Sequence, residues 1–168
     1  MNSTQNKPIL EKPIIKSIAI SCNTFLRPDI LAKTLDSIAK LNIPDGILIK
    51  VLVVDNDKNA TAKPVVEKIK ITYPFDLTYC VEEKRGLANA RNRLLQEAIN
   101  LGVSHIAILD DDDIADKDWI LNLVDLYNNQ ENAYIISGPE YCCFDGEFPK
   151  YLTNNNIFVK KRQRKKAN

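Results

Sequence analysis

The sequence predicts one α/β domain with a mostly parallel sheet between two layers of helices, a three-layer α/β/α sandwich. Apolar, strand-like segments alternate with amphipathic helical segments along the chain. This alternation is typical of parallel strands joined by crossover helices. The five glycines and eight prolines fall between these segments or in the first turn of a helix, as breaks between elements should. The 168 residues suffice for one domain of ordinary size.

The first elements follow from apolar spacing. Residues 17–22, SIAISC, predict a short buried strand, and Pro28 opens a helix whose apolar side chains recur every three to four residues. Asn42 and Pro44 end that helix. Residues 50–54 form a nearly continuous β-branched run, as expected for a strand covered on both faces.

The middle of the chain continues the alternation. Residues 61–71 predict a helix, in which Pro64 is tolerated because it lies in the first turn. Residues 77–81 predict a third strand. The apolar stripe of residues 87–101 predicts a second strong helix, and Gly102 supplies its C-terminal stop.

The alternation of strand-like and helical segments ends in the last part of the chain. Residues 105–109 predict a strand that ends on four aspartates, residues 118–127 a short helix, and residues 133–137 a fifth strand. After Phe148 the residues become polar and basic, so we expect the architecture to be incomplete. The predicted division is a disordered extension over 1–16, a domain over 17–150 and a polar, basic tail over 151–168.

Charge is concentrated at the C-terminal end. Residues 160–166, KKRQRKK, hold six bases and no acid. The rest of the chain has 17 basic and 22 acidic side chains, a net charge of −5, so we exclude nucleic acid as a partner. The tail suits peripheral contact with an anionic membrane, although a solvated terminus explains the same residues.

The compartment follows from what the sequence lacks. The longest apolar stretch, residues 47–54, is much shorter than the ~20 residues of a membrane helix. The first fifteen residues are too polar for a secretory signal. The four cysteines, at positions 22, 80, 142 and 143, show no C-x-x-C spacing. We therefore expect a cytoplasmic protein with reduced thiols, placed at the inner face of the membrane if the tail binds lipid.

Polar segments follow three of the predicted strands: residues 23–24, residues 55–57 and residues 110–113. In open parallel sheets ligands bind beyond the carboxyl ends of the strands. Four adjacent carboxylates repel one another, and a hard divalent cation shared with a phosphorylated substrate would relieve that repulsion. The alternative is an acidic loop in which one aspartate caps the next helix.

A second feature is the cluster of Arg85, Arg91 and Arg93 at a predicted helix start, where the helix dipole disfavours cations. A bound anion explains this placement, and ion pairs with nearby acids are the alternative. Asp55 and Asp57 are candidates to accept hydrogen bonds from a base or sugar, and a self-capping turn is the alternative.

Four ordered motifs then resemble one known family, the family 2 glycosyltransferases. They are SCNTFLRPDILAKTLDSI, VLVVDND, RGLANARN and IAILDDDDIADKDWI, and the resemblance covers about residues 17–150. It implies a Rossmann-like GT-A fold, a nucleotide-diphosphate sugar donor with a UDP-sugar favoured, and a divalent metal, Mn²⁺ or Mg²⁺. It also implies a saccharide or lipid-linked acceptor and a role in cell-surface polysaccharide biosynthesis.

The resemblance also implies roles for residues that match the motifs. The run Asp110, Asp111 and Asp112 resembles the D-x-D motif of the donor site. Asp112 would contact the metal, and Asp110 would contact the metal and the donor's ribose or sugar.

Other matching residues would line the rest of the donor site. Asp55 resembles the acid that binds the nucleotide base, with Thr24 lining the same pocket, and Asp57 is a further candidate for donor binding. Arg85 and Arg91 match basic positions near the base and phosphates. Leu26 departs from the family pattern, because it stands where a polar Asn is common.

The mechanism implied is inversion at the anomeric carbon, with a carboxylate that deprotonates the acceptor hydroxyl. Family members usually take this base from a Glu-Asp motif in an acceptor-binding half, and this sequence contains no Glu-Asp dipeptide. The catalytic base is therefore not identified. Either the chain is an N-terminal fragment that binds donor without turnover, which we prefer, or another subunit completes the acceptor site.

Two other functions compete with this prediction. A phosphatase of the haloacid dehalogenase type also places D-x-D after a strand, but it normally has Thr or Val where Ile114 stands, and it has a longer chain after the motif. A non-catalytic module that binds nucleotide sugars is the stronger alternative. Sugar release with and without acceptor separates it from an enzyme.

Overall fold

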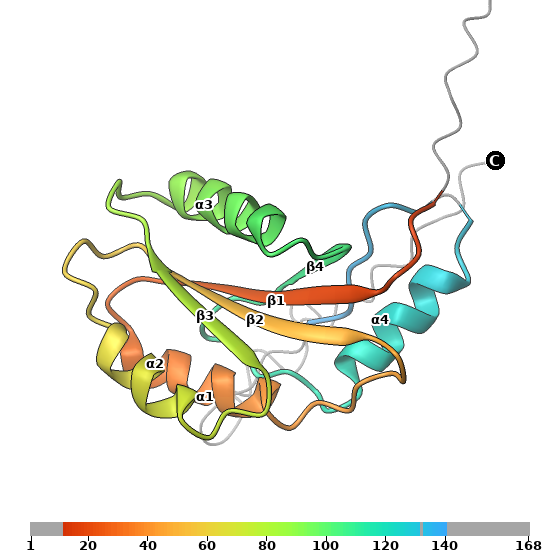
Figure 1. Ribbon diagram of the computed structural model, residues 1–168, viewed down its shortest axis with the longest axis horizontal. Helices are drawn as coiled ribbons and strands as arrows, with labels where there is room; N and C mark the ends of the chain where they lie inside the picture. The colour runs from red at the N-terminus through yellow and green to blue at the C-terminus, as the bar shows by residue number, and fades with distance from the viewer. Residues whose placement is uncertain (1–11, 132, 141–168) are drawn as a thin grey trace, which may run out of the picture. The chain divides into compact units, whose positions relative to one another are not determined.

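The protein is described here by a computed structural model that covers residues 12–131 and 133–140. Strands and helices alternate along these residues (Figure 1). The strands are β1 (Ser17–Thr24), β2 (Leu48–Asp55), β3 (Asp76–Val81) and β4 (His105–Ile108). The helices are α1 (Pro28–Ile38), α2 (Lys63–Lys70), α3 (Leu87–Asn100) and α4 (Trp119–Asn128).

The four strands form one parallel sheet in the order β3-β2-β1-β4. Thr24 pairs with Asp55, and Asp55 pairs with Val81, so the carboxyl ends of β1, β2 and β3 are level. Two further backbone bonds extend the ladder beyond them: the Asn56 N–H donates to the Thr24 carbonyl at 2.8 Å, and the Glu82 N–H donates to the Asp55 carbonyl at 2.9 Å. The loops that follow the strands therefore start from one row.

Helices cover both faces of the sheet. α3 lies over one face, and α1 and α2 lie over the other (Figure 1). The larger core joins α1, α2 and α4 to one face of the sheet through the side chains of Ile18, Ile20, Leu31, Leu35, Ile38, Val51, Val53, Val66, Ile120 and Val124. The smaller core, under α3, comprises Ala19, Leu52, Val54, Ala90, Leu94 and Ala98. The predicted three-layer sandwich with a parallel sheet is confirmed.

The helices begin and end where the local sequence allows. α1 has Pro28 in its first turn, where its missing N–H breaks no helical bond. It ends at Ile38, before Asn42, because Lys40 and Leu41 bond back to carbonyls three residues earlier in a tighter turn. α3 presents Ala90 and Ala98 to the sheet, and these small side chains let the helix pack closely.

The predicted strand at 133–137 is wrong. These residues have no regular secondary structure, and Ile135 is 85% exposed. The run is apolar but short, so its pattern carried no information about a neighbouring strand to pair with. The basic tail and residues 1–11 of the predicted extension lie outside the described residues.

The described end of that extension contacts α4. The Lys12 ammonium donates to the carbonyl oxygens of Tyr127 and Gln130 and lies over the Tyr127 ring. The Tyr127 hydroxyl donates to the Pro13 carbonyl at 2.9 Å. These contacts tie the chain before β1 to α4. Across residues 12–131 and 133–140, no helix has the length and apolar character needed to cross a membrane.

Candidate functional site

The structure brings the three predicted polar segments to the carboxyl edge of the sheet. Thr24 ends β1, and Asp55 ends β2 beside it. The last residue of β4, Ile108, pairs with Ser21, and the Leu109 N–H donates to the Ser21 carbonyl at 3.1 Å. The aspartates that follow β4 therefore begin alongside the end of β1.

The aspartate run alternates between solvent and protein. The side chains of Asp110 and Asp112 are 60% and 54% exposed, whereas that of Asp111 is 1% exposed. The Thr34 hydroxyl of α1 donates to the Asp111 carbonyl at 2.7 Å, and the Asp113 N–H closes a turn onto the Asp110 carbonyl at 3.1 Å. The outer two carboxylates face water while the middle one faces the fold.

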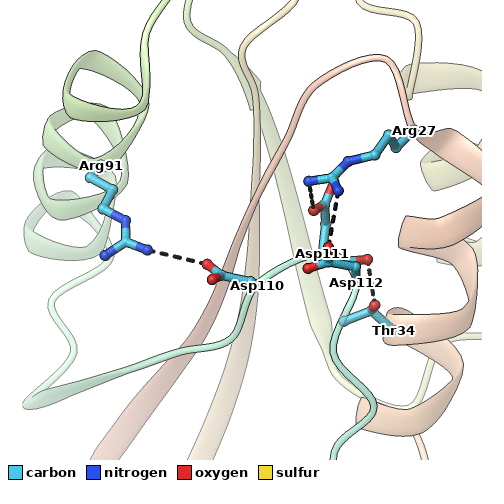
Figure 2. Close-up of polar contacts among 6 residues, drawn as sticks. All are labelled: Arg27, Thr34, Arg91, Asp110, Asp111 and Asp112. Carbon is cyan, nitrogen blue, oxygen red and sulfur yellow. Dashed lines mark hydrogen bonds and ion pairs between the residues drawn. The ribbon is translucent and has the colours of Figure 1, made fainter. Parts of the chain in front are cut away.

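An arginine lies against each side of the run (Figure 2). Arg27, from the loop between β1 and α1, places Nη2 at 2.5 Å from an oxygen of Asp111 and Nη1 at 3.0 Å from Oδ2 of Asp112. Arg91, from α3, places Nη2 at 3.2 Å from Oδ1 of Asp110. Each exposed carboxylate thus has one oxygen in an ion pair.

Burial dominates the electrostatics of the middle aspartate. Desolvation raises the pKa of the Asp111 carboxyl above its ordinary value, and the Thr24 hydroxyl and the Arg27 guanidinium oppose the rise. The Thr24 hydroxyl is near enough for this effect but forms no hydrogen bond of normal geometry with any described group. The Thr24 hydroxyl and, after it, the Arg27 guanidinium thus favour the ionised form of a nearly inaccessible acid.

Several buried polar atoms at this edge have no partner among the described residues. They are both side-chain amide atoms of Asn23, the Thr24 hydroxyl, Oδ2 of Asp57 and Oδ2 of Asp111. Unsatisfied buried polar atoms are rare in folded proteins because each one loses its hydrogen bonds to water. Their gathering at the ends of β1, β2 and the aspartate run points to a ligand that completes them.

The turn after β2 is held together by its own side chains. Asp55 is fully buried: one oxygen accepts from the Asp57 N–H at 3.0 Å, and the other accepts from the Ala62 N–H at 3.0 Å and the Tyr79 hydroxyl at 2.7 Å. Asn56 donates to the carbonyls of Glu82 and Lys84, both at 2.9 Å. The self-capping turn, which is the alternative interpretation of Asp55 and Asp57 from the sequence, is therefore present.

Asn56 also builds the start of α3. Its side-chain oxygen accepts from the Gly86 N–H at 2.7 Å. Gly86 precedes α3 with φ at 132°, where a side chain is strained, and an added Cβ would come within 3.3 Å of the Asn89 amide nitrogen. The turn after β2 thus determines where the first residues of α3 lie.

The three arginines near the start of α3 point to different places. Arg85 is exposed and stacks its guanidinium over the Phe25 ring at 4.7 Å. Arg91 meets the aspartate run, as the ion-pair alternative expected. Arg93 pairs with Glu97, one turn later on the same helix, at 2.8 Å. Two of the three therefore face the loops at the carboxyl edge.

Sequence reasoning missed Arg27 and Tyr79, and it included Asn56 in the polar segment 55–57 without a role of its own. Arg27 stands directly before Pro28, in a position that a local pattern assigns to a helix boundary. Its two aspartate partners lie 84 and 85 residues away. Tyr79 looked like a strand residue and nothing more. Only the parallel pairing of β2 with β3 places its hydroxyl on Asp55.

The aspartate run has side chains of the chemistry that binds a divalent cation. Asp110 and Asp112 offer exposed carboxylate oxygens, the ligands that Mg²⁺ and Mn²⁺ prefer. Within the part of the chain that the structure describes, no three Asp, Glu, His or Cys side chains come together as a ready-made cage. Phosphate oxygens and water commonly complete the coordination of Mg²⁺ in proteins.

The sequence matches the model of one protein family, Glycosyl transferase family 2, over residues 18–168. It is 30% identical over 140 residues to the succinoglycan biosynthesis protein ExoM of Rhizobium meliloti (strain 1021), covering 83% of this chain and 44% of that protein. It is 34% identical over 74 residues to a glucosyl-dolichyl phosphate glucuronosyltransferase of Haloferax volcanii, covering 42% of this chain and 22% of that protein. The chain thus spans less than half the length of these curated relatives.

Solved structures share the fold. TarS of S. aureus (residues 1–349) superimposes with a TM-score of 0.56 at 17% identity, over 73% of this chain and 39% of that chain. The mannosyltransferase PcManGT of Pyrobaculum calidifontis, solved with GDP-Man and Mn²⁺, superimposes with a TM-score of 0.55 at 24% identity, over 71% and 35%. TarS has also been solved with UDP and with UDP-GlcNAc. The expected GT-A fold is confirmed.

Proposed function

Because this chain belongs to glycosyl transferase family 2, we propose that it takes part in transfer of a sugar from a nucleotide-diphosphate donor to an acceptor hydroxyl. The carboxyl edge of its sheet would bind the donor. The observation that carries this proposal is the gathering there of unpartnered buried polar atoms, counted among the described residues, beside two exposed carboxylates. Such an edge is the usual ligand site of a parallel sheet.

Asp110 and Asp112 would hold a divalent cation, Mn²⁺ or Mg²⁺. When bound, such an ion neutralises negative charge on a leaving diphosphate. The presence of Mn²⁺ with GDP-Man in PcManGT supports the use of a metal by a protein of this fold. Asp111, which faces the fold, would support the donor site through Arg27 and its backbone.

The other basic and polar residues at this edge would bind the phosphates, the base and the ribose of the donor. Arg91 lies beside Asp110, and Arg85 lies over Phe25, so both would meet phosphate oxygens or the base. Thr24 and Asp57 would bind the base and the ribose through side-chain oxygens that have no hydrogen-bond partner among the described residues.

Asp55 would support the base pocket by holding the turn after β2. It is fully buried, so any contact of its own with the base would require the turn to move.

We favour a UDP-sugar as donor, since UDP and UDP-GlcNAc bind to TarS, with a GDP-sugar as the comparison. The names of the two curated relatives support a saccharide or lipid-linked acceptor and a role in polysaccharide biosynthesis. Transfer would invert the anomeric carbon. The acceptor base is assigned to no residue. We also propose that the protein acts at the cytoplasmic face of a membrane, which its basic tail would contact.

Calorimetric titration tests the donor site. UDP and GDP are each titrated into the full chain with Mn²⁺, with Mg²⁺ and with chelator. We expect metal-dependent UDP binding that weakens about tenfold or more in Asp112→Ala. The matched control is Asp76→Ala, because Asp76 is an exposed aspartate at the opposite end of the strands. Equal loss in both variants, or no nucleotide binding by the folded chain, contradicts the proposal.

A second candidate is a module that binds nucleotide sugars without transferring them. The polar atoms at the carboxyl edge that have no partner in the described part of the chain support donor binding, which such a module shares with an enzyme. Release of labelled sugar from UDP-GlcNAc, measured with and without a saccharide acceptor, separates the two. Acceptor-stimulated release supports transfer, and donor binding without release supports the module.

A further inference from the structure

Arg27 joins a buried acid to an exposed one. Its guanidinium donates from Nη2 to Asp111, whose side chain is inaccessible, and from Nη1 to Oδ2 of Asp112, which faces water (Figure 2). One fixed cation therefore already occupies a carboxylate to which the proposed function assigns a divalent ion.

The backbone on both sides of Arg27 restricts the conformation of this residue. Leu26 has φ at 55°, in the left-handed region that an ordinary side chain disfavours, and Pro28 restricts the backbone on the other side. The Arg27 carbonyl accepts from the Leu31 N–H at 3.0 Å, so the residue also belongs to the first turn of α1. Strained backbone of this kind is often found at functional sites, where the surrounding structure maintains it.

The two contacts of Arg27 differ in strength. The contact with Asp111 is short and partly buried, because the Asp111 side chain is 1% exposed, whereas the contact with Asp112 is exposed and therefore weakened by solvent. When Asp112 takes another partner, the guanidinium remains held by Asp111. It stays next to that partner as a positive charge.

We propose that Arg27 is a positioning residue that makes binding of the divalent cation depend on the nucleotide diphosphate. This inference rests on the proposed function and deepens it. Without nucleotide, the guanidinium and the cation compete for Asp112 and repel each other. The negative diphosphate compensates both charges, so the cation binds weakly alone and more tightly with nucleotide. By linkage, the cation strengthens nucleotide binding by the same factor.

The test measures Mn²⁺ binding, with and without saturating UDP, from the electron paramagnetic resonance signal of free Mn²⁺. The variant is Arg27→Gln, and the matched control is Arg93→Gln, which removes an arginine paired with Glu97 on α3. We expect Arg27→Gln to bind Mn²⁺ alone about two- to fivefold more tightly, the scale of an exposed ion pair. The strengthening by UDP should fall by a similar factor, and Arg93→Gln should match the wild type.

Two further variants separate this role from a structural one. Arg27→Gln combined with Asp111→Asn removes the buried charge together with its partner, and it should fold and show the same loss of coupling. Arg27→Lys keeps a cation at the position and should restore part of the coupling. A merely structural residue would change stability without changing the ratio of the two Mn²⁺ affinities.

The possible results distinguish the two proposals. If the wild type binds Mn²⁺ and UDP, but the folded Arg27 variants show the same UDP effect on Mn²⁺ affinity, this inference is overturned and the donor site stands. If UDP has no effect on Mn²⁺ affinity in the wild type, this inference is overturned, and by linkage the metal dependence expected of the donor site is overturned with it. If the wild type binds neither Mn²⁺ nor UDP, the proposed function fails and the inference fails with it.

Discussion

Two aspartate clusters lie at the same edge of the sheet and differ in almost every physical respect. In the turn after β2, Asp55 is fully buried and accepts three hydrogen bonds from the protein. In the run after β4, Asp110 and Asp112 face water, and each has one oxygen against an arginine. The first cluster stabilises a loop, and the second is accessible to a ligand.

The difference follows from the position of the two strands in the sheet. β2 lies between β1 and β3, so the loop that leaves it is enclosed by the loops of its neighbours. Asn56 bonds to the turn before α3, and Tyr79 reaches across from β3. β4 is one of the two edge strands of the described sheet, so it has a neighbour on one side only. Identical side chains therefore meet different surroundings.

The largest expected effect separates the clusters by stability. Asp55→Ala leaves two backbone N–H groups and the Tyr79 hydroxyl without their acceptor, so it should lower the free energy of unfolding by about 3 kcal/mol. Asp112→Ala removes an exposed side chain and should stay within about 0.5 kcal/mol of the wild type. Urea unfolding measures both. Equal losses would remove the distinction between the clusters.

The second prediction sharpens the comparison within the aspartate run. Arg27→Ala leaves the buried Asp111 carboxylate without its guanidinium and should cost about 2 kcal/mol of unfolding free energy. Arg91→Ala breaks an exposed pair with Asp110 and should cost about 0.5 kcal/mol or less. Thermal and urea unfolding in chelator give the values. If Arg91→Ala lowers the unfolding free energy more than Arg27→Ala does, Asp111 is not the aspartate whose ion pair matters most for stability.

The third prediction concerns pH and the turn after β2. Burial and the hydrogen bond to Asp55 raise the pKa of the Tyr79 hydroxyl above its ordinary value. Above about pH 10 the unfolded chain loses this proton while the folded chain keeps it, so stability falls as pH rises. Tyr79→Phe should cost about 1 kcal/mol at pH 7 and should lose stability less steeply above pH 10.

The control for that prediction is Tyr73→Phe. Burial also raises the pKa of Tyr73, but its hydroxyl donates to the Leu35 carbonyl instead of an aspartate. Its hydrogen bond should therefore be independent of the turn after β2. If neither variant changes the alkaline slope of the unfolding free energy, the tyrosines do not control it.

The smallest expected effect concerns the loop that carries Arg27. Leu26→Asn should stabilise the protein by about 0.5 kcal/mol, because Asn tolerates the left-handed backbone at φ 55° better than Leu does. The matched control is Leu87→Asn, which changes an exposed leucine in the first turn of α3. Chemical unfolding compares the two. A gain in both variants would indicate a general benefit of removing exposed leucine.

This position also bears on the family resemblance. The resemblance implies an Asn where this chain has Leu26. The backbone supplies a reason for Asn there, since the residue adopts a conformation that Asn accepts readily.

The alternation of strands and helices could be predicted from the amino-acid sequence, because the apolar periodicity of each element is local. The eight elements within the described part of the chain were predicted within a few residues of their bounds. The expected strand at 133–137 failed for the opposite reason, since a strand exists only with a neighbour to pair with and a short apolar run does not name one. The family, too, was visible in ordered motifs.

Tertiary structure alone decided which polar side chains are available. Asp55, Asp111 and Asp112 have the same chemistry and similar sequence surroundings, yet two are inaccessible and one is exposed. Their partners, Tyr79 and Arg27, come from segments 24, 84 and 85 residues away. Burial and pairing over such separations arise from the order of strands in the sheet, which sets the accessibility of each carboxylate and the partners within its reach.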